Sequence, residues 1–275
     1  SDIAIGLARV MGFDFPDNFR TPYFSRNFSE FWTRWHISLS SWLRDYLYIP
    51  LGGNRGGSLG SRLFTMLSLL GSVALTGWWW LLPIYAVVVA ATVYWMRGKP
   101  ENEVHLYTYL NLMITMLLGG LWRGASWAFV FWGFLHGSYL VVQRLLGPLW
   151  GKLLDALYIP NWLQAAFDIA LVYSLTCLAW IYFRAPDFDI ANQIITGIAS
   201  LEKFTPGSIV NKFWVVKGFL VIGILVLVDW TNLRFTYYRV LLRQPVFRVL
   251  SFAALLWLIA FFGTFGANSF IYFQF

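Results

Sequence analysis

FSEFWTRWHISLSSWLRDYLYIPLGGNRGG, residues 28–57, is the stretch that decides how the rest of the chain is interpreted. Its large apolar side chains recur at helical offsets, which predicts one continuous helix with an apolar stripe made of Trp32, Trp35, Leu39, Trp42, Leu43 and Tyr46. Polar residues follow the other side: Arg34, Ser38, Ser41, Asp45 and Tyr48. His36 is predicted at the border between the two faces, where an imidazole could handle protons in contact with both lipid and water.

Pro50 and the glycine-rich run after it end this predicted helix. Four glycines surround Asn54 and Arg55 at positions 52, 53, 56 and 57. Glycine permits backbone conformations that other residues rarely adopt, so the run predicts a loop whose backbone can approach a phosphate or another segment closely.

The composition is that of a membrane protein. Of 275 residues, 59% are hydrophobic and only 12% are charged, whereas soluble domains carry charge on roughly a quarter of their residues. The single cysteine, Cys177, excludes an internal disulfide and lies in an apolar run, which indicates a buried residue. The net charge of +7 comes without a basic soluble domain, so nucleic-acid binding is excluded. We expect an all-α polytopic membrane protein.

Seven apolar runs are candidate membrane helices, judged against the roughly 20 residues that one span needs. They cover residues 62–80, 82–97, 106–121, 125–143, 163–183, 213–230 and 248–265. Several are short, which favours tilted and re-entrant segments. Gly119, Gly120 and Gly124 predict a helix break at residue 123. Non-helical backbone at membrane depth is tolerated only inside protein or beside a wet cavity, so this break indicates a site.

Lys and Arg in the short loops predict the orientation. If the spans alternate, one side carries Arg55, Arg62, Arg97, Lys99, Arg144, Lys152, Arg234, Arg239 and Arg243. That side is expected to be cytoplasmic. The loop 184–212, with Asp187, Asp189, Glu202 and Lys203, then faces the periplasm of a bacterium.

The sequence of residues 28–57 resembles the signature of the membrane-bound O-acyltransferases (MBOAT). The resemblance is greatest to the branch with alginate O-acetyltransferases and teichoic-acid D-alanyl transfer proteins. Residues 2–19, 118–137 and 270–275 are similar to the family's lead-in, second motif and ending. The resemblance implies an MBOAT-like helical bundle with re-entrant and amphipathic helices in the bacterial inner membrane. It also implies that residues 1–275 are a single membrane domain and the C-terminal portion of a longer enzyme, whose N-terminal half is a missing partner.

Within that domain the expected parts follow the motifs. An amphipathic lead-in with the RWHISLS motif covers residues 1–61, and a membrane hairpin covers 62–97. The second motif lies in 106–143, and C-terminal membrane helices fill 163–275.

The second motif departs from the family pattern. Relatives usually carry histidine, regarded as the principal catalytic residue, where LWRGASW has Arg123. Arginine stays protonated and cannot act as a general base, although it could stabilise an oxyanion or hold a phosphate-bearing donor. His136 is no simple substitute, because thirteen residues on one helix place it about 20 Å further along.

The predicted site combines residues of both motifs. Candidate catalytic residues are His36, Arg123 and His136, and candidate substrate-binding residues are Trp32, Trp35, Arg44, Asp45, Trp122 and Trp127. His36 serves either as a base or as a hydrogen-bonding residue that only holds its helix, and His136 either lines a pore or makes a helix contact. Arg44 and Asp45 are expected to fix the helix against the loop. No metal site and no bound cofactor are predicted.

The family resemblance implies a membrane-bound O-acyltransferase. It would move an acyl group, with acetyl as the first candidate, from acetyl-CoA or another acyl thioester. The acceptor would be an extracytoplasmic polysaccharide or a partner such as an acyl carrier protein. The Arg123 departure keeps a second hypothesis open, a non-catalytic membrane scaffold or acyl conduit that docks a separate periplasmic acyltransferase. A transporter would need internal repeats, which the sequence does not show.

Overall fold

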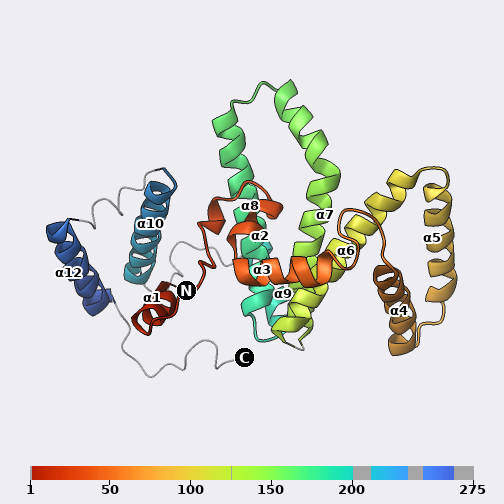
Figure 1. Ribbon diagram of the computed structural model, residues 1–275, viewed down its shortest axis with the longest axis horizontal. Coiled ribbons are helices and arrows are strands. Elements are labelled where there is room, and N and C mark those ends of the chain that lie inside the picture. The colour runs from red at the N-terminus through yellow and green to blue at the C-terminus, as the bar shows by residue number, and fades with distance from the viewer. Residues whose placement is uncertain (1, 125, 201–211, 235–243, 263–275) are drawn as a thin grey trace. The chain divides into compact units, whose positions relative to one another are not determined.

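The computed structural model describes residues 2–124, 126–200, 212–234 and 244–262, and every regular element in these ranges is helical (Figure 1). The predicted all-α class is therefore confirmed. The chain divides into two compact units, Ser1–Ala199 and Ser200–Phe275, which are described separately. The assignment of the whole chain to a single domain stays a prediction, and the ending at 270–275 lies outside the described residues.

The helices follow one another with short connections. The first unit begins with α1 (Asp2–Val10), the 3-10 turn η1 (Pro22–Phe24), α2 (Phe28–Arg34), α3 (Ile37–Leu43) and the π-helical turn η2 (Arg44–Tyr48). It continues with α4 (Leu59–Thr76), α5 (Leu81–Met96), α6 (Pro100–Arg123), α7 (Trp127–Ala156), α8 (Asn161–Arg184) and α9 (Phe188–Ser200). The second unit contains α10 (Lys212–Arg234) and α12 (Pro245–Phe262).

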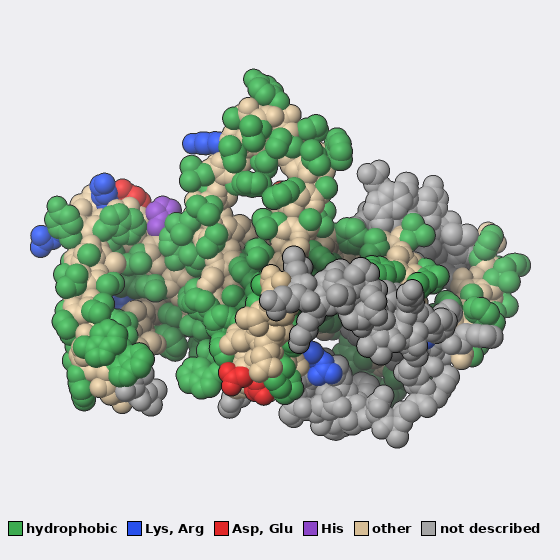
Figure 2. Space-filling model, turned by 180° about the vertical axis from the view of Figure 1, so that it is seen from behind, with side chains coloured by type: hydrophobic (Ala, Val, Ile, Leu, Met, Phe, Trp, Pro, Cys, Tyr) green, Lys and Arg blue, Asp and Glu red, His purple; other side chains and the backbone are tan. Residues whose placement is uncertain are grey.

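Two described helices, α6 and α8, are long and apolar enough to cross a membrane. Shorter apolar segments occur at Leu59–Ala74, Leu81–Met96, Val216–Leu227 and Pro245–Leu258. Large apolar side chains are exposed along these helices, and Figure 2 shows them over much of the visible described surface with few charges between them. An apolar surface of this extent is what contact with lipid requires.

Two predicted boundaries were wrong. The helix expected over 125–143 extends as α7 to Ala156, because Arg144 and Lys152 end the apolar run without disfavouring a helix. The loop expected over 184–212 contains the amphipathic helix α9, whose Asn192 side chain accepts a hydrogen bond of 2.8 Å from the Tyr182 hydroxyl. Glu202 and Lys203 lie outside the described residues.

Glycines allow α6 and α7 to pack with their backbones nearly in contact. A Cβ added to Gly120 would collide with the Phe129 carbonyl oxygen, and one added to Gly133 would collide with the Met116 carbonyl oxygen. Small residues at helix contacts are the usual means of close approach in membrane proteins. The predicted break is confirmed, since α6 ends at Arg123 and α7 begins at Trp127.

The core lies where the signature segment meets α7 and α8. Its buried residues include Phe28, Phe31 and Trp32 of α2, Trp132 of α7 and Ala179 of α8. Helix α2 contacts α7, η2 contacts α6, and the Trp35 ring contacts that of Trp180 on α8, so the signature lies across three helices of the first unit (Figure 1). This arrangement carries the first motif to the broken end of α6.

Because α6 packs closely on α7, adding one methyl group at this contact should lower the stability of the protein. Gly133→Ala should destabilise the detergent-solubilised full-length protein by about 1 to 3 kcal/mol, because the added Cβ must push the two backbones apart. Gly151→Ala is the matched control, since it lies on the same helix with nothing within 4 Å of the added Cβ. It should be neutral or stabilising by up to about 1 kcal/mol. Equal thermal unfolding midpoints for the two variants would contradict this packing.

Candidate functional site

The signature segment is not one continuous helix, as its periodicity predicted. Helix α2 ends at Arg34 and α3 begins at Ile37, with His36 in the left-handed region at φ 43° and ψ 57°. Such a backbone costs a non-glycine residue on the order of 1 to 3 kcal/mol, so the surrounding contacts must enforce it. His36 therefore lies at a helix break and not along a helix face.

Asn18, from the lead-in segment, holds this break. Its carbonyl oxygen accepts the Ile37 N–H at 3.0 Å, and its side-chain Oδ1 accepts the Ser38 N–H at 2.9 Å and the Ser38 hydroxyl at 2.6 Å. These bonds satisfy donors at the start of α3 that have no partner within the helix. Asn18 thus replaces the cap that the His36 side chain does not provide.

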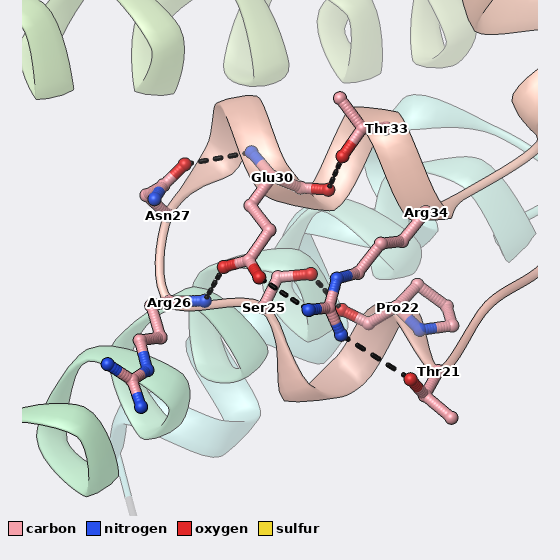
Figure 3. Close-up of polar contacts among 8 residues, drawn as sticks. All are labelled: Thr21, Pro22, Ser25, Arg26, Asn27, Glu30, Thr33 and Arg34. Carbon is pink, nitrogen blue, oxygen red and sulfur yellow. Dashed lines mark hydrogen bonds and ion pairs between the residues drawn. The ribbon is translucent and has the colours of Figure 1, made fainter. Parts of the chain in front are cut away.

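Glu30 ties the lead-in to α2 (Figure 3). Asn27 caps the helix by accepting the Glu30 N–H at 2.8 Å, and the Glu30 carboxylate accepts the Arg26 N–H at 2.7 Å. The same carboxylate pairs with Arg34 at 2.6 Å, and Arg34 also donates to the Thr21 hydroxyl at 3.4 Å. The sequence analysis missed this cluster, although Asn27 followed three residues later by Glu30 is a recognisable capping pattern.

The break changes which signature residues are buried. Trp32 and Leu43 are buried, whereas Trp42 is 46% and Tyr46 67% exposed. The single apolar stripe that the periodicity predicted is therefore divided, because the break at His36 and the π-helical turn η2 rotate Trp42 and Tyr46 away from the core. Trp35 is half-buried and stacks on Phe31.

His36 lies half-buried beside Phe19, with 5.9 Å between ring centroids. Burial lowers the pKa of His36 below its usual 6.5, and the positive charge of Arg123 lowers this pKa further. The imidazole is therefore neutral at neutral pH and can accept a proton.

Arg123 ends α6 and is half-buried. Its guanidinium carbon lies 4.5 Å from the centroid of the Phe183 ring on α8, a cation–π contact that helps to hold the charge within the protein. The second motif thus places a fixed positive charge where α6, α8 and the signature segment converge.

His136 occupies a different place, in the aromatic core between α2 and α7. It is 0% exposed, and its ring centroid lies 4.9 Å from that of Trp132, 5.2 Å from Trp32 and 5.8 Å from Phe31. Neither ring nitrogen has a hydrogen-bond partner among the described residues. Its position is about 14 Å along α7 from the start of that helix, so it makes a core contact well away from the break after Arg123.

Comparison with known proteins identifies the family. Residues 1–97 match the profile of MBOAT, the membrane-bound O-acyltransferase family. The chain is 34% identical over 233 residues to the probable alginate O-acetylase AlgI of Pseudomonas aeruginosa, covering 82% of this chain and 33% of that protein. It is 36% identical over 205 residues to the Azotobacter vinelandii protein of the same name, with 74% and 30% covered. The chain belongs to the membrane-bound O-acyltransferase family.

Other branches of the family are also similar. The peptidoglycan O-acetyltransferase of Helicobacter pylori is 31% identical over 202 residues, covering 73% of this chain and 28% of that relative. The chain thus spans about a third or less of the length of these relatives.

The remaining predicted site residues of this acyltransferase family member lie at its surface. Arg44 and Asp45 are exposed and their side chains pair with each other at 2.8 Å. Within the described part of the chain, neither side chain is hydrogen-bonded to the glycine loop that they were expected to fix. Trp122 is 59% and Trp127 79% exposed. Trp127 lines an apolar cavity of about 470 Å³ with Leu117, Val130, Phe131, Phe134 and Phe188. The roles of all these residues stay predictions.

The proximity of Arg123 predicts how His36 titrates. Carbethoxylation of His36 in the full-length protein, followed by peptide mass spectrometry across pH, should show a midpoint below 6.5, since only the neutral imidazole reacts. Arg123→Gln should raise this midpoint while leaving it below 6.5, because burial is the larger cause. Arg62→Gln, which removes a cation paired with Glu103, should leave it unchanged. If the pH midpoint of His36 carbethoxylation is the same in the Arg123→Gln variant as in the wild type, the charge of Arg123 does not act on His36.

Proposed function

We propose that this chain is the part of an O-acyltransferase that moves an acyl group, acetyl in the first place, from a thioester to a hydroxyl. The observation that carries the proposal is the helix break at the half-buried His36, in a fold that also holds the Arg123 guanidinium at the end of α6 against Phe183. Acyl transfer to an oxygen requires a base for the hydroxyl proton and a positive group near the developing oxyanion. These two residues supply both groups.

The proposed reaction begins when His36 accepts the proton of the acceptor hydroxyl. The hydroxyl oxygen forms a bond to the thioester carbonyl carbon, and the carbonyl oxygen becomes an oxyanion next to Arg123. Collapse of this intermediate breaks the carbon–sulfur bond and releases a thiolate, which takes the proton back from His36. The products are an ester and a free thiol. Arg123 stabilises the charge only in the intermediate, which is where stabilisation raises the rate.

The proposed donor is acetyl-CoA or another acyl thioester, and no bound cofactor is required. The proposed acceptor is an extracytoplasmic polysaccharide or a partner carrier protein, with a periplasmic acyltransferase as a further candidate partner. The names of the relatives support a glycan, since they refer to alginate and peptidoglycan. The proposed location is a bacterial inner membrane, which the bacterial relatives and the membrane-length apolar helices support.

A catalytically impaired scaffold or acyl conduit is the second candidate function. It is favoured by one observation, that arginine stands at position 123, where this family is expected to carry histidine. A scaffold would depend on the packing of the signature segment but not on the chemistry of His36 or Arg123.

Substitution of His36 separates the imidazole from the backbone conformation. Asparagine tolerates the left-handed region, so His36→Asn should keep the break and the normal abundance of the full-length protein in membranes. Because it cannot accept the proton, polymer acylation should fall by about 10²- to 10⁴-fold. His36→Ala should lose acylation as well and also be less stable. Normal acylation by the asparagine variant would remove His36 from the mechanism.

Substitution of Arg123 distinguishes the enzyme from the scaffold. In an assay of acyl transfer by the full-length protein, Arg123→Lys should retain part of the rate, because the charge remains. Arg123→Ala should lose on the order of 10²- to 10³-fold, and Arg123→His should restore or raise transfer, because imidazole can also accept a proton. Equal rates for the wild type, the alanine variant and the histidine variant would favour the scaffold.

A further inference from the structure

The glycine loop after η2 is folded tightly against α6. Gly52 and Gly56 have φ of 115° and 119°, and a Cβ added to Gly52 would collide with the Gly56 carbonyl oxygen. The buried Asn111 side chain of α6 donates to the Gly53 carbonyl at 3.2 Å and to the Gly56 carbonyl at 3.3 Å. The loop therefore has one fixed shape, which fixes the direction of the residues at its tip.

Two arginines belong to this tip, one through a hydrogen bond and one through its place in the chain. Asn54 Oδ1 accepts a hydrogen bond of 2.8 Å from Arg144 of α7 and one of 2.6 Å from the Tyr48 hydroxyl. Arg55 follows Asn54 in the chain and is exposed. The loop thereby collects guanidinium groups from segments almost 90 residues apart in the sequence.

These two cations are not compensated by acidic side chains within the described part of the chain. Five other arginines there lie within ion-pairing distance of a carboxylate, namely Arg9, Arg20, Arg34, Arg44 and Arg62. Neither Arg55 nor Arg144 has such a partner among the described residues. Guanidinium groups without an acidic partner attract an anion, and the fork of donors on each matches the oxygens of a phosphate.

Three backbone N–H groups of the loop are already used within the segment. The N–H groups of Gly52, Gly53 and Arg55 donate to the carbonyl oxygens of Ile49, Tyr48 and Gly52 within the same segment. The two arginine side chains supply the positive charge at this tip, and substitution tests their contribution to anion binding.

We propose that Arg55 and Arg144 form a binding site for a phosphate ester. Resting on the proposed transferase function, we assign this phosphate to the thioester donor, of the coenzyme A or phosphopantetheine class. The loop positions predicted to be cytoplasmic from the Lys and Arg count include both residues, which is the side on which such a donor is expected. Anionic lipid headgroups carry the same phosphate chemistry and are the alternative source.

Direct binding tests the site without turnover. The full-length protein in phosphatidylcholine nanodiscs should bind coenzyme A at least about tenfold more weakly when Arg55→Gln and Arg144→Gln are combined, because two charge-assisted contacts are lost. Binding of pantetheine, which has no phosphate, should not change. Arg62→Gln is the matched control, because it removes an exposed arginine whose charge is already paired with Glu103. Unchanged elution profiles would show that the variants fold.

A second arm identifies the source of the phosphate. Weaker binding of coenzyme A assigns the site to the donor, and weaker binding only to vesicles containing phosphatidylglycerol assigns it to lipid headgroups. Unchanged binding of both overturns the site.

A separate assay of acyl transfer distinguishes a failure of the binding site from a failure of the proposed function. If the wild type binds coenzyme A through these arginines but transfers no acyl group, the proposed function fails and the site stands. If transfer occurs and the double variant keeps the wild-type KM for the donor, the site fails alone.

Discussion

The left-handed backbone at His36 is the constraint on which the site depends. A continuous helix would place this imidazole along a helix face, whereas the break turns α3 away from α2 at that residue. Asn18 makes the break stable by capping α3 from the lead-in segment, and Glu30 holds that lead-in to α2. The chemistry of one side chain therefore depends on hydrogen bonds made by residues on both sides of it in the sequence.

A second constraint is the close approach of α6 and α7. Gly120 and Gly133 let the two backbones meet, so that α6 ends with Arg123 against Phe183 of α8. The signature segment then lies across α6, α7 and α8, and the Arg123 charge adds to burial in lowering the pKa of His36. In this account, glycine packing positions the cation and the helix break positions the base.

The sequence predicted the helical class and the break at residue 123, because apolar periodicity and glycine clusters are local signals. It did not predict the break at His36, because that conformation is imposed by Asn18 and histidine is not a residue that marks a turn. The exposure of Trp42 and Tyr46 follows from the same missed break. The length of α7 was not predicted, because Arg144 and Lys152 end the apolar run that marked the expected span but are compatible with a continuing helix. The grouping of Arg123 and His36 in one site stays a prediction, and their roles rest on the proposed function.

The measurement that tests this account most directly is an experimental density map of the full-length protein, determined in nanodiscs by electron cryomicroscopy at side-chain resolution. The account predicts two short helices meeting at a left-handed His36, the Asn18 side chain bonded to Ser38, and the Arg123 guanidinium on the same side of the break as the imidazole. A continuous helix through residues 28–43, or an Arg123 side chain directed into lipid away from His36, would contradict it.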